Sequence, residues 1–76
     1  MTTYNGHKNW DYWNVSLWIN NDERLYNQAR QMVWTYKSKA RAAKYFCDHL
    51  RACGITKTPD GAKYNIERVK AAMSDM

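Results

Sequence analysis

The sequence predicts a mainly all-α protein, a compact single domain of four helices over residues 1–76 with a short turn or mini-hairpin before the last helix. Gly and Pro are scarce, at three and one residues, while Ala, Lys, Arg and Met are frequent, which favours helices over a turn-rich β fold. Four Trp, six Tyr and one Phe supply the large side chains that so small a core needs. Apolar residues recur at helical spacing along much of the chain.

Residues 1–8 have no periodicity and predict an irregular lead-in. A first helix follows from about Trp10 to Ile19, with Asn9 as its N-cap. Its two apolar faces are Trp10, Trp13 and Leu17 on one side and Tyr12, Val15 and Ile19 on the other. A helix that is apolar on both sides lies between other elements, so we expect this one to be central and its tryptophans, Trp18 included, to build the core. The alternative is that these indoles form a binding surface.

The second helix is predicted to begin at Asn20 or Asn21, where Glu23 completes a partial capping box with Asn20. Its buried stripe is Leu25, Tyr26, Ala29, Met32, Val33 and Tyr36. Trp34 falls outside this stripe, on the polar side of the helix beside Arg30. It is the best candidate for an exposed anchor, and the alternative is that a neighbouring segment covers it.

A third helix is predicted from an N-cap at Ser38 to Gly54. Its expected buried stripe is Ala42, Ala43, Phe46, Leu50 and Cys53. Its outer side gathers Lys37, Arg41, Lys44 and Arg51, with Asp48 among them. Cations at a helix start oppose the helix dipole, a local cost that hints at a use elsewhere.

Residues 55–64 change character around Thr58-Pro59-Asp60-Gly61, a sequence typical of a tight turn. We expect an ordered loop or a minimal hairpin that pairs 55–58 with 62–64, since an isolated hairpin is marginally stable. The last helix is expected from an N-cap at Asn65 to about Ser74. Its buried stripe would be Ile66, Val69 and Met73.

The sequence lacks the residue patterns that several classes of functional site require. Cys47, His49 and Cys53 are close in sequence, but residues 47 and 49 point about 200° apart on a helix, so no metal site is expected. The two cysteines would lie about 9 Å apart along a helix, too far for a disulfide, so we expect free, mostly buried thiols. No glycine-rich phosphate loop and no nucleophile–base pair stands out, which predicts no enzyme, no cofactor and no small-molecule substrate.

The chain has no long apolar run and no basic-then-apolar leader, so no membrane contact is expected and a cytoplasmic location in a host cell is predicted. The net charge of +5 fits a partner with an acidic protein surface, and nucleic acid is the alternative. The candidate partner-binding residues are Arg30, Trp34, Lys37, Lys39, Arg41, Lys44 and Arg51. The alternative is that the same cations form only a solvated helix surface.

Two stretches resemble a family of small uncharacterised proteins of phages and other mobile elements. The first is Tyr4-Asn5-Gly6 with the run Asn9-Trp10-Asp11-x-Trp13-Asn14-Val15-x-Leu17-Trp18-Ile19-x-Asn21-Asp22. The second is the Thr58-Pro59-Asp60-Gly61 turn. The resemblance is close over residues 4–26 and weaker over 55–70, and Tyr12 stands where the family pattern has Thr.

The resemblance implies a genomic setting in which small single-domain proteins bind one host machine and block it. We therefore expect a non-enzymatic inhibitor of a host defence system, CRISPR–Cas or restriction, that binds a protein complex. The alternative function is a small basic nucleic-acid-binding accessory protein. An inert structural module is a third class.

Overall fold

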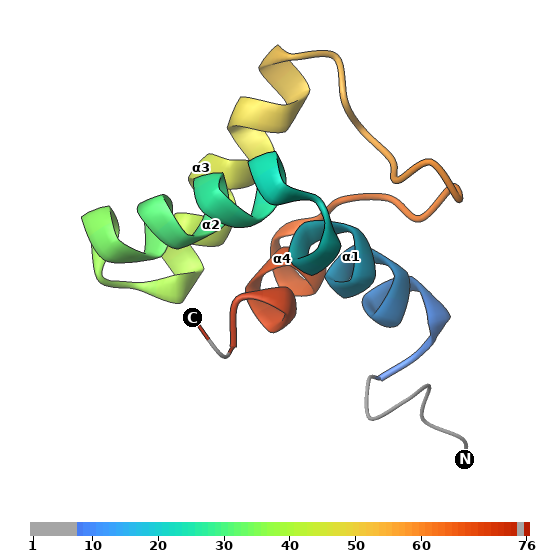
Figure 1. Ribbon diagram of the computed structural model, residues 1–76, viewed down its shortest axis with the longest axis horizontal. Coiled ribbons are helices and arrows are strands. Elements are labelled where there is room, and N and C mark those ends of the chain that lie inside the picture. The colour runs from blue at the N-terminus through green and yellow to red at the C-terminus, as the bar shows by residue number, and fades with distance from the viewer. Residues whose placement is uncertain (1–7, 75) are drawn as a thin grey trace.

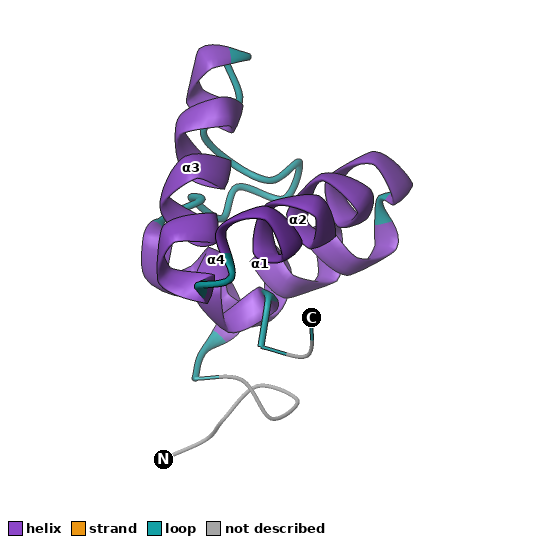
Figure 2. Ribbon diagram, turned by 90° about the vertical axis from the view of Figure 1, so that its left-hand side faces the viewer, coloured by secondary structure: helices purple, strands orange, loops and turns teal. Residues whose placement is uncertain are grey.

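The computed structural model describes residues 8–74 and 76. Its helices are α1 (Trp10–Asn21), α2 (Glu23–Tyr36), α3 (Lys39–Ala52) and α4 (Ile66–Ala72), so the predicted all-α fold of four helices is confirmed (Figure 1). All the regular structure drawn in Figure 2 is helical. The Tyr4-Asn5-Gly6 turn and most of the expected lead-in lie outside the described residues.

The helices are arranged as a ring in which each packs on two others. The helices α2 and α3 form a hairpin, α4 packs on α3 and α1, and α1 closes the ring against α2. Among the described helices, α1 does not reach α3, so the expectation of a central first helix was wrong. The core therefore lies in the middle of the ring.

That core is built from small and medium side chains. Its members are Val15, Ile19, Ala29, Ala42, Ala43, Phe46, Cys47, Leu50, Ala62, Val69, Ala72 and Met73. Alanines occupy core positions on α2, α3 and α4, and Phe46 is the largest fully buried side chain. Trp10 is 38% exposed, and Trp13 and Trp18 are only half-buried, so the tryptophans flank the core that they were expected to build.

The boundary between α1 and α2 differs from the prediction. The first helix continues to Asn21, and Asn20 donates its side-chain amide back to the Ser16 carbonyl at 2.8 Å instead of capping the next helix. The cap of α2 is Asp22, whose carboxylate accepts from the backbone N–H groups of Arg24 and Leu25. A carboxylate satisfies free N–H groups and matches the dipole at a helix start.

The end of α3 is a Schellman motif. Gly54 has φ 78°, and its N–H donates to the Arg51 carbonyl at 3.0 Å, while the Ile55 N–H donates to the Leu50 carbonyl at 2.8 Å. The predicted glycine stop is therefore confirmed, although the helix ends at Ala52. Cys53 becomes the exposed cap residue and not part of the buried stripe.

The connection from α3 to α4 is a loop with a minimal hairpin. Lys57 and Lys63 form a single antiparallel bridge, and the Thr58 N–H donates to the Ala62 carbonyl at 2.8 Å across the turn. This matches the expected minimal hairpin. The last helix starts after its Asn65 cap as predicted but ends at Ala72.

The stripe of α4 is narrower than expected. Val69 and Met73 are buried, whereas Ile66 is 45% exposed at the helix start. Polar contacts fasten α4 to α1: Arg68 pairs with Asp11 at 3.3 Å, and the Tyr12 hydroxyl donates to Glu67.

Candidate functional site

The candidate site is the corner where α2 turns into α3, defined here as Trp34, Tyr36, Lys37, Arg41, Lys44 and Tyr45. Figure 1 shows this end of the hairpin projecting from the rest of the molecule. All six residues are exposed. We call this set the α2–α3 corner.

Trp34 is the most exposed large apolar side chain of the described chain, at 75%. Residue 34 lies on the side of α2 opposite the buried Ala29, which is why no neighbouring helix covers it. The Lys37 ammonium lies 5.2 Å from the centre of its ring. A cation over the face of an indole is attracted by the ring electrons, so the exposed side chains of Lys37 and Trp34 form a cation–π pair.

The placement of Lys37 depends on the end of α2. Lys37 has φ 54°, in the left-handed region, and its N–H donates to the Val33 carbonyl at 2.9 Å. This reversal ends the helix and lets Ser38 begin the next one. The same geometry positions the Lys37 side chain beside Trp34.

A second aromatic group joins the two helices at the corner. The rings of Tyr36 and Tyr45 stack with their centroids 4.6 Å apart, and the Lys44 ammonium lies 5.9 Å from the Tyr45 ring centre. Sequence analysis placed Tyr36 in the buried stripe and passed over Tyr45. Tyr45 falls outside the Ala42–Phe46–Leu50 stripe at helical spacing, which is the signal that identifies it as exposed.

The other predicted residues are distributed around this corner. Arg30 lies one turn before Trp34 and stacks over Tyr26 at 5.8 Å. Lys39 is half-buried, and its ammonium donates to the Ser74 carbonyl, which engages it with the C-terminal segment. Arg51 is about 10 Å farther along α3 than Lys44 and pairs with Asp48 at 3.7 Å. Arg51 therefore lies beyond the α2–α3 corner along α3, and Lys39 is directed toward the C-terminal segment.

A polar cluster that sequence analysis missed links α1 to the loop before α4. Asn14, only 1% exposed, donates its Nδ2 to Asp60 Oδ2 at 2.9 Å and accepts from the Thr58 hydroxyl on its Oδ1. Trp18 Nε1 donates to the same Asp60 oxygen at 2.9 Å. The two hydrogen bonds, first from Asn14 and then from Trp18, lower the pKa of Asp60 against the opposing effect of desolvation.

This cluster joins the two stretches that carry the sequence resemblance. Its two parts, the Trp-rich run and the Thr-Pro-Asp-Gly turn, are the two sides of one hydrogen-bonded latch. The signal was the position of Asn14 on a helix side that is otherwise apolar. We call Asn14, Trp18, Thr58 and Asp60 the α1–loop latch.

The two thiols differ from each other. Cys47 is buried and burial raises its pKa, whereas Cys53 is exposed, contrary to the expectation of two mostly buried thiols. Cys53 Sγ lies 4.0 Å from His49 Nε2.

Across the described residues, no three His, Cys, Asp or Glu side chains are grouped so as to hold a metal ion. No described helix has the length and apolar character needed to cross a membrane.

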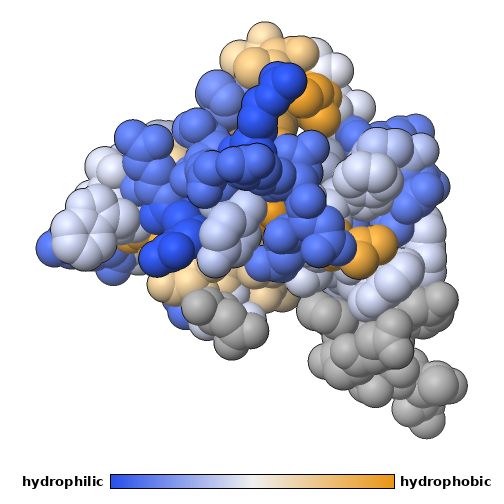
Figure 3. Space-filling model, viewed as in Figure 1, coloured by the Kyte–Doolittle hydropathy of each residue, from blue (hydrophilic) through white to orange (hydrophobic). Residues whose placement is uncertain are grey.

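Fold and surface together define a small all-α protein with an exposed cation–aromatic corner. Figure 3 shows one mostly hydrophilic face of it, with hydrophilic side chains gathered over α2 and hydrophobic ones in smaller patches. The chain belongs to the family of unknown function DUF7249, whose family model matches residues 1–76. Comparisons with curated proteins and with solved structures give no match.

Proposed function

We propose that this protein is a non-enzymatic binding protein whose α2–α3 corner docks on an acidic surface of a partner protein complex. The observation that carries the proposal is Trp34, 75% exposed and accompanied by the Lys37 ammonium at 5.2 Å. An indole in water loses the free energy that burial would give it, so it fits an anchor that is buried on binding. Trp, Tyr and Arg are the side chains that most often dominate binding energy at protein interfaces.

The shape of the corner favours a protein recess as its partner. Trp34 and Tyr36 are two residues apart on one helix, so they point about 200° apart around it. The corner is therefore a convex projection and not a flat patch or a groove. Lys37, Arg41 and Lys44 surround it with positive charge, which fits a recess with an acidic rim.

Nucleic acid is the second candidate, and the same cations and rings support it. Single strands bind by stacking bases on free aromatic faces along a positively charged groove. Here the Tyr36 and Tyr45 rings already stack on one another, and one face of Trp34 has Lys37 over it. The corner thus offers fewer free faces than such a protein uses, which favours the protein partner.

The setting that we propose is inhibition of a host defence system, CRISPR–Cas or restriction, by steric blocking of one of its complexes. This part comes from the resemblance to proteins of phages and mobile elements. A convex corner with one dominant anchor is consistent with blocking by occupation of a recess, because such a mechanism needs no reacting groups.

The test is a tagged pull-down from lysates of defence-positive hosts, followed by a plaque assay on the same hosts. Wild-type protein should capture a defence complex and restore phage growth. Trp34→Ala should weaken binding by about 30-fold or more, as loss of a dominant anchor does. Trp10→Ala is the matched control, since Trp10 is also exposed but lies at the far end of α1 from the corner.

A gel-shift experiment separates the nucleic-acid candidate. Labelled single-stranded DNA and RNA are titrated at low and moderate salt. Binding that weakens steeply with salt and is lost in Lys37→Glu with Lys44→Glu would support nucleic acid instead. Phage growth that is not restored on any defended host would overturn the proposed inhibition.

A further inference from the structure

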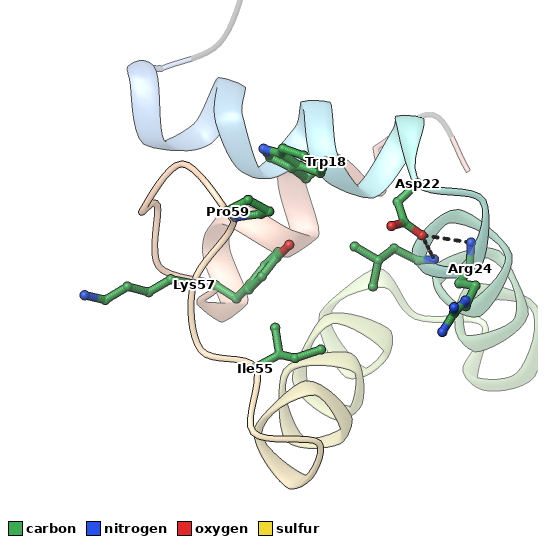
Figure 4. A pocket seen from close by; sticks show the side chains of 8 residues that line it. Trp18, Asp22, Arg24, Ile55, Lys57 and Pro59 are labelled. Atoms are coloured by element: carbon green, nitrogen blue, oxygen red, sulfur yellow. Dashed lines mark hydrogen bonds between the residues drawn. The ribbon is translucent and has the colours of Figure 1, made fainter.

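A hollow of about 500 Å³ lies between the α1–α2 junction and the loop before α4 (Figure 4). Its walls are largely apolar and come from Trp18, Leu25, Ile55, Pro59 and Tyr64. This volume falls in the range of sites that take a small molecule or one or two side chains of a peptide. The hollow adjoins the N-terminal end of α2, whereas the α2–α3 corner is at the other end of that helix.

The α1–loop latch fixes the shape of this hollow. Trp18 has its Nε1 bonded to Asp60, so its polar edge is satisfied and its ring forms part of the wall. Figure 4 shows Trp18 from α1 next to Pro59 of the turn, with Ile55 across the open space. Because the latch holds the turn against α1, the hollow is formed before any ligand arrives.

Charged side chains surround the apolar walls. Arg24 and Lys57 lie at opposite ends of the hollow in Figure 4. Among the described residues the ion pairs are Arg51–Asp48 and Arg68–Asp11, so neither of these two cations is in one. Asp22 is the one acid in the lining, and its Oδ1 accepts from two backbone N–H groups at the start of α2, at 3.0 and 3.1 Å. The lining thus has two unpaired cations and one carboxylate that is already engaged.

Tyr64 also lines the hollow, and its side chain is half-buried. Burial, and then the charge of Asp22, raise the pKa of the Tyr64 phenol. The phenol therefore stays neutral and adds no negative charge that would repel an acidic ligand. Its ring is part of the apolar lining, together with Ile55 and Trp18.

We infer that this hollow is a second docking site, independent of the α2–α3 corner, for an extended peptide segment with apolar side chains flanked by carboxylates. The apolar side chains would contact Trp18, Ile55 and Pro59. The flanking carboxylates would reach Arg24 at one end and Lys57 at the other. Charge complementarity at both ends selects an acidic segment over a neutral or a basic one.

Three blocked peptides test the inference by NMR titration of the ¹⁵N-labelled protein. They are acetyl-Glu-Leu-Phe-Glu-amide and the same peptide with both Glu replaced by Gln or by Lys. The Glu peptide should shift the Trp18 indole N–H resonance and the Leu25 and Ile55 amides. The Gln peptide should bind about 2- to 30-fold more weakly, as the loss of two exposed ion pairs implies, and the Lys peptide more weakly still.

Charge reversal provides the decisive variant. Arg24→Glu with Lys57→Glu alters two exposed side chains and should reverse the preference, so that the Lys peptide binds better than the Glu peptide. Arg30→Glu with Lys44→Glu, on α2 and α3 and outside the lining of the hollow, is the matched control and should leave the preference unchanged. Equal binding of all three peptides, shifts confined to the α2–α3 corner, no shift at millimolar peptide, or an unreversed preference would each overturn the inference. Shifts confined to the α2–α3 corner would leave the proposed function standing, and Trp34 is unchanged in both variants, so the proposed function is tested separately.

Discussion

Asn14 shows at the scale of one residue how a buried polar group can specify a fold. Its amide nitrogen donates to Asp60 and its amide oxygen accepts from Thr58, so both ends of the side chain have partners more than forty positions away in sequence. Thr58 in turn accepts from the Ala62 N–H at 3.1 Å. A satisfied buried network of this kind fixes one arrangement, because any other arrangement leaves polar groups without partners.

We predict that Asn14→Ala lowers the free energy of unfolding by about 1–3 kcal/mol. The change removes the acceptor of the Thr58 hydroxyl and one of the two donors to Asp60. Urea denaturation followed by tryptophan fluorescence measures it. Asn20→Ala is the matched control, because Asn20 is exposed on the same helix and, among the described residues, its side chain bonds only to Ser16. It should change stability by less than about 0.5 kcal/mol. Equal effects of the two variants would contradict the assigned role.

Asp60 predicts a stability that falls in acid. Its pKa lies below the ordinary 3.8 in the folded protein because Asn14 and Trp18 donate to its ionised carboxylate. A lowered folded pKa stabilises the native state above 3.8, and this contribution is lost as the pH falls through the lower folded value.

The test compares wild type with Asp60→Asn in urea denaturation from neutral pH to well below 3.8. The uncharged amide keeps an oxygen that can accept the same hydrogen bonds. The wild type should be the more stable at neutral pH, and the difference should shrink in acid. In a Trp18→Phe background, which lacks one donor, the difference should be smaller at every pH. A difference that is independent of pH would rule out the carboxylate charge as its cause.

At the scale of a secondary-structure element, the end of α2 is strained. Lys37 adopts φ 54° and ψ 22°, a conformation that side chains with a Cβ disfavour and that glycine adopts readily. Gly54 fills the equivalent position after α3 without that cost. A lysine at the first site carries this backbone cost, and its ammonium lies beside Trp34.

We therefore predict that Lys37→Gly raises the free energy of unfolding by about 0.5–1 kcal/mol relative to Lys37→Ala. Both variants lose the ammonium beside Trp34, so their difference isolates the backbone strain. Both should weaken partner binding to a similar degree. Thermal unfolding and the pull-down, run on the same two proteins, separate stability from binding. Equal stability of the Gly and Ala variants would show that the left-handed backbone costs nothing here.

At the scale of the whole molecule, the sequence predicted the helices better than their arrangement. Local signals, namely capping residues, apolar stripes and the glycine stop, placed all four helices to within a few residues. They misassigned Asn20 because capping residues stand at 20, 21 and 22 alike, and in the folded protein Asp22 is the cap.

The candidate site was predictable only in part, for the same physical reason. Trp34 stood out because its helix position is incompatible with the buried stripe. Tyr36 was assigned to the buried stripe but is exposed, and Lys39 is half-buried, because the surroundings of both depend on distant segments, the Tyr45 ring and the Ser74 carbonyl. The position of Asn14 on an apolar helix side was a local signal of its burial, but its pairing with Asp60 was not predictable, since nothing in either segment identifies its partner.

The closed ring of helices makes a prediction about cooperativity that the two thiols can report. Cys53 is exposed and should react at once with a disulfide reagent such as DTNB. Cys47 is 6% exposed among α3 and its neighbours, and burial raises its pKa, so it should react only when the structure opens. Cys53→Ser should remove the fast phase and Cys47→Ser the slow one.

The slow phase then measures whether opening involves the whole ring. The latch residue Asn14 does not lie on α3, and α1 does not reach α3 among the described helices. If opening is global, Asn14→Ala should accelerate the reaction of Cys47 by about 5- to 150-fold, the factor that corresponds to its loss of stability. If the reaction of Cys47 is unchanged in that variant, α3 opens locally and the ring does not unfold as one unit. A latch on the far side of the ring that controls the reactivity of Cys47 would show that the four helices share a single cooperative core.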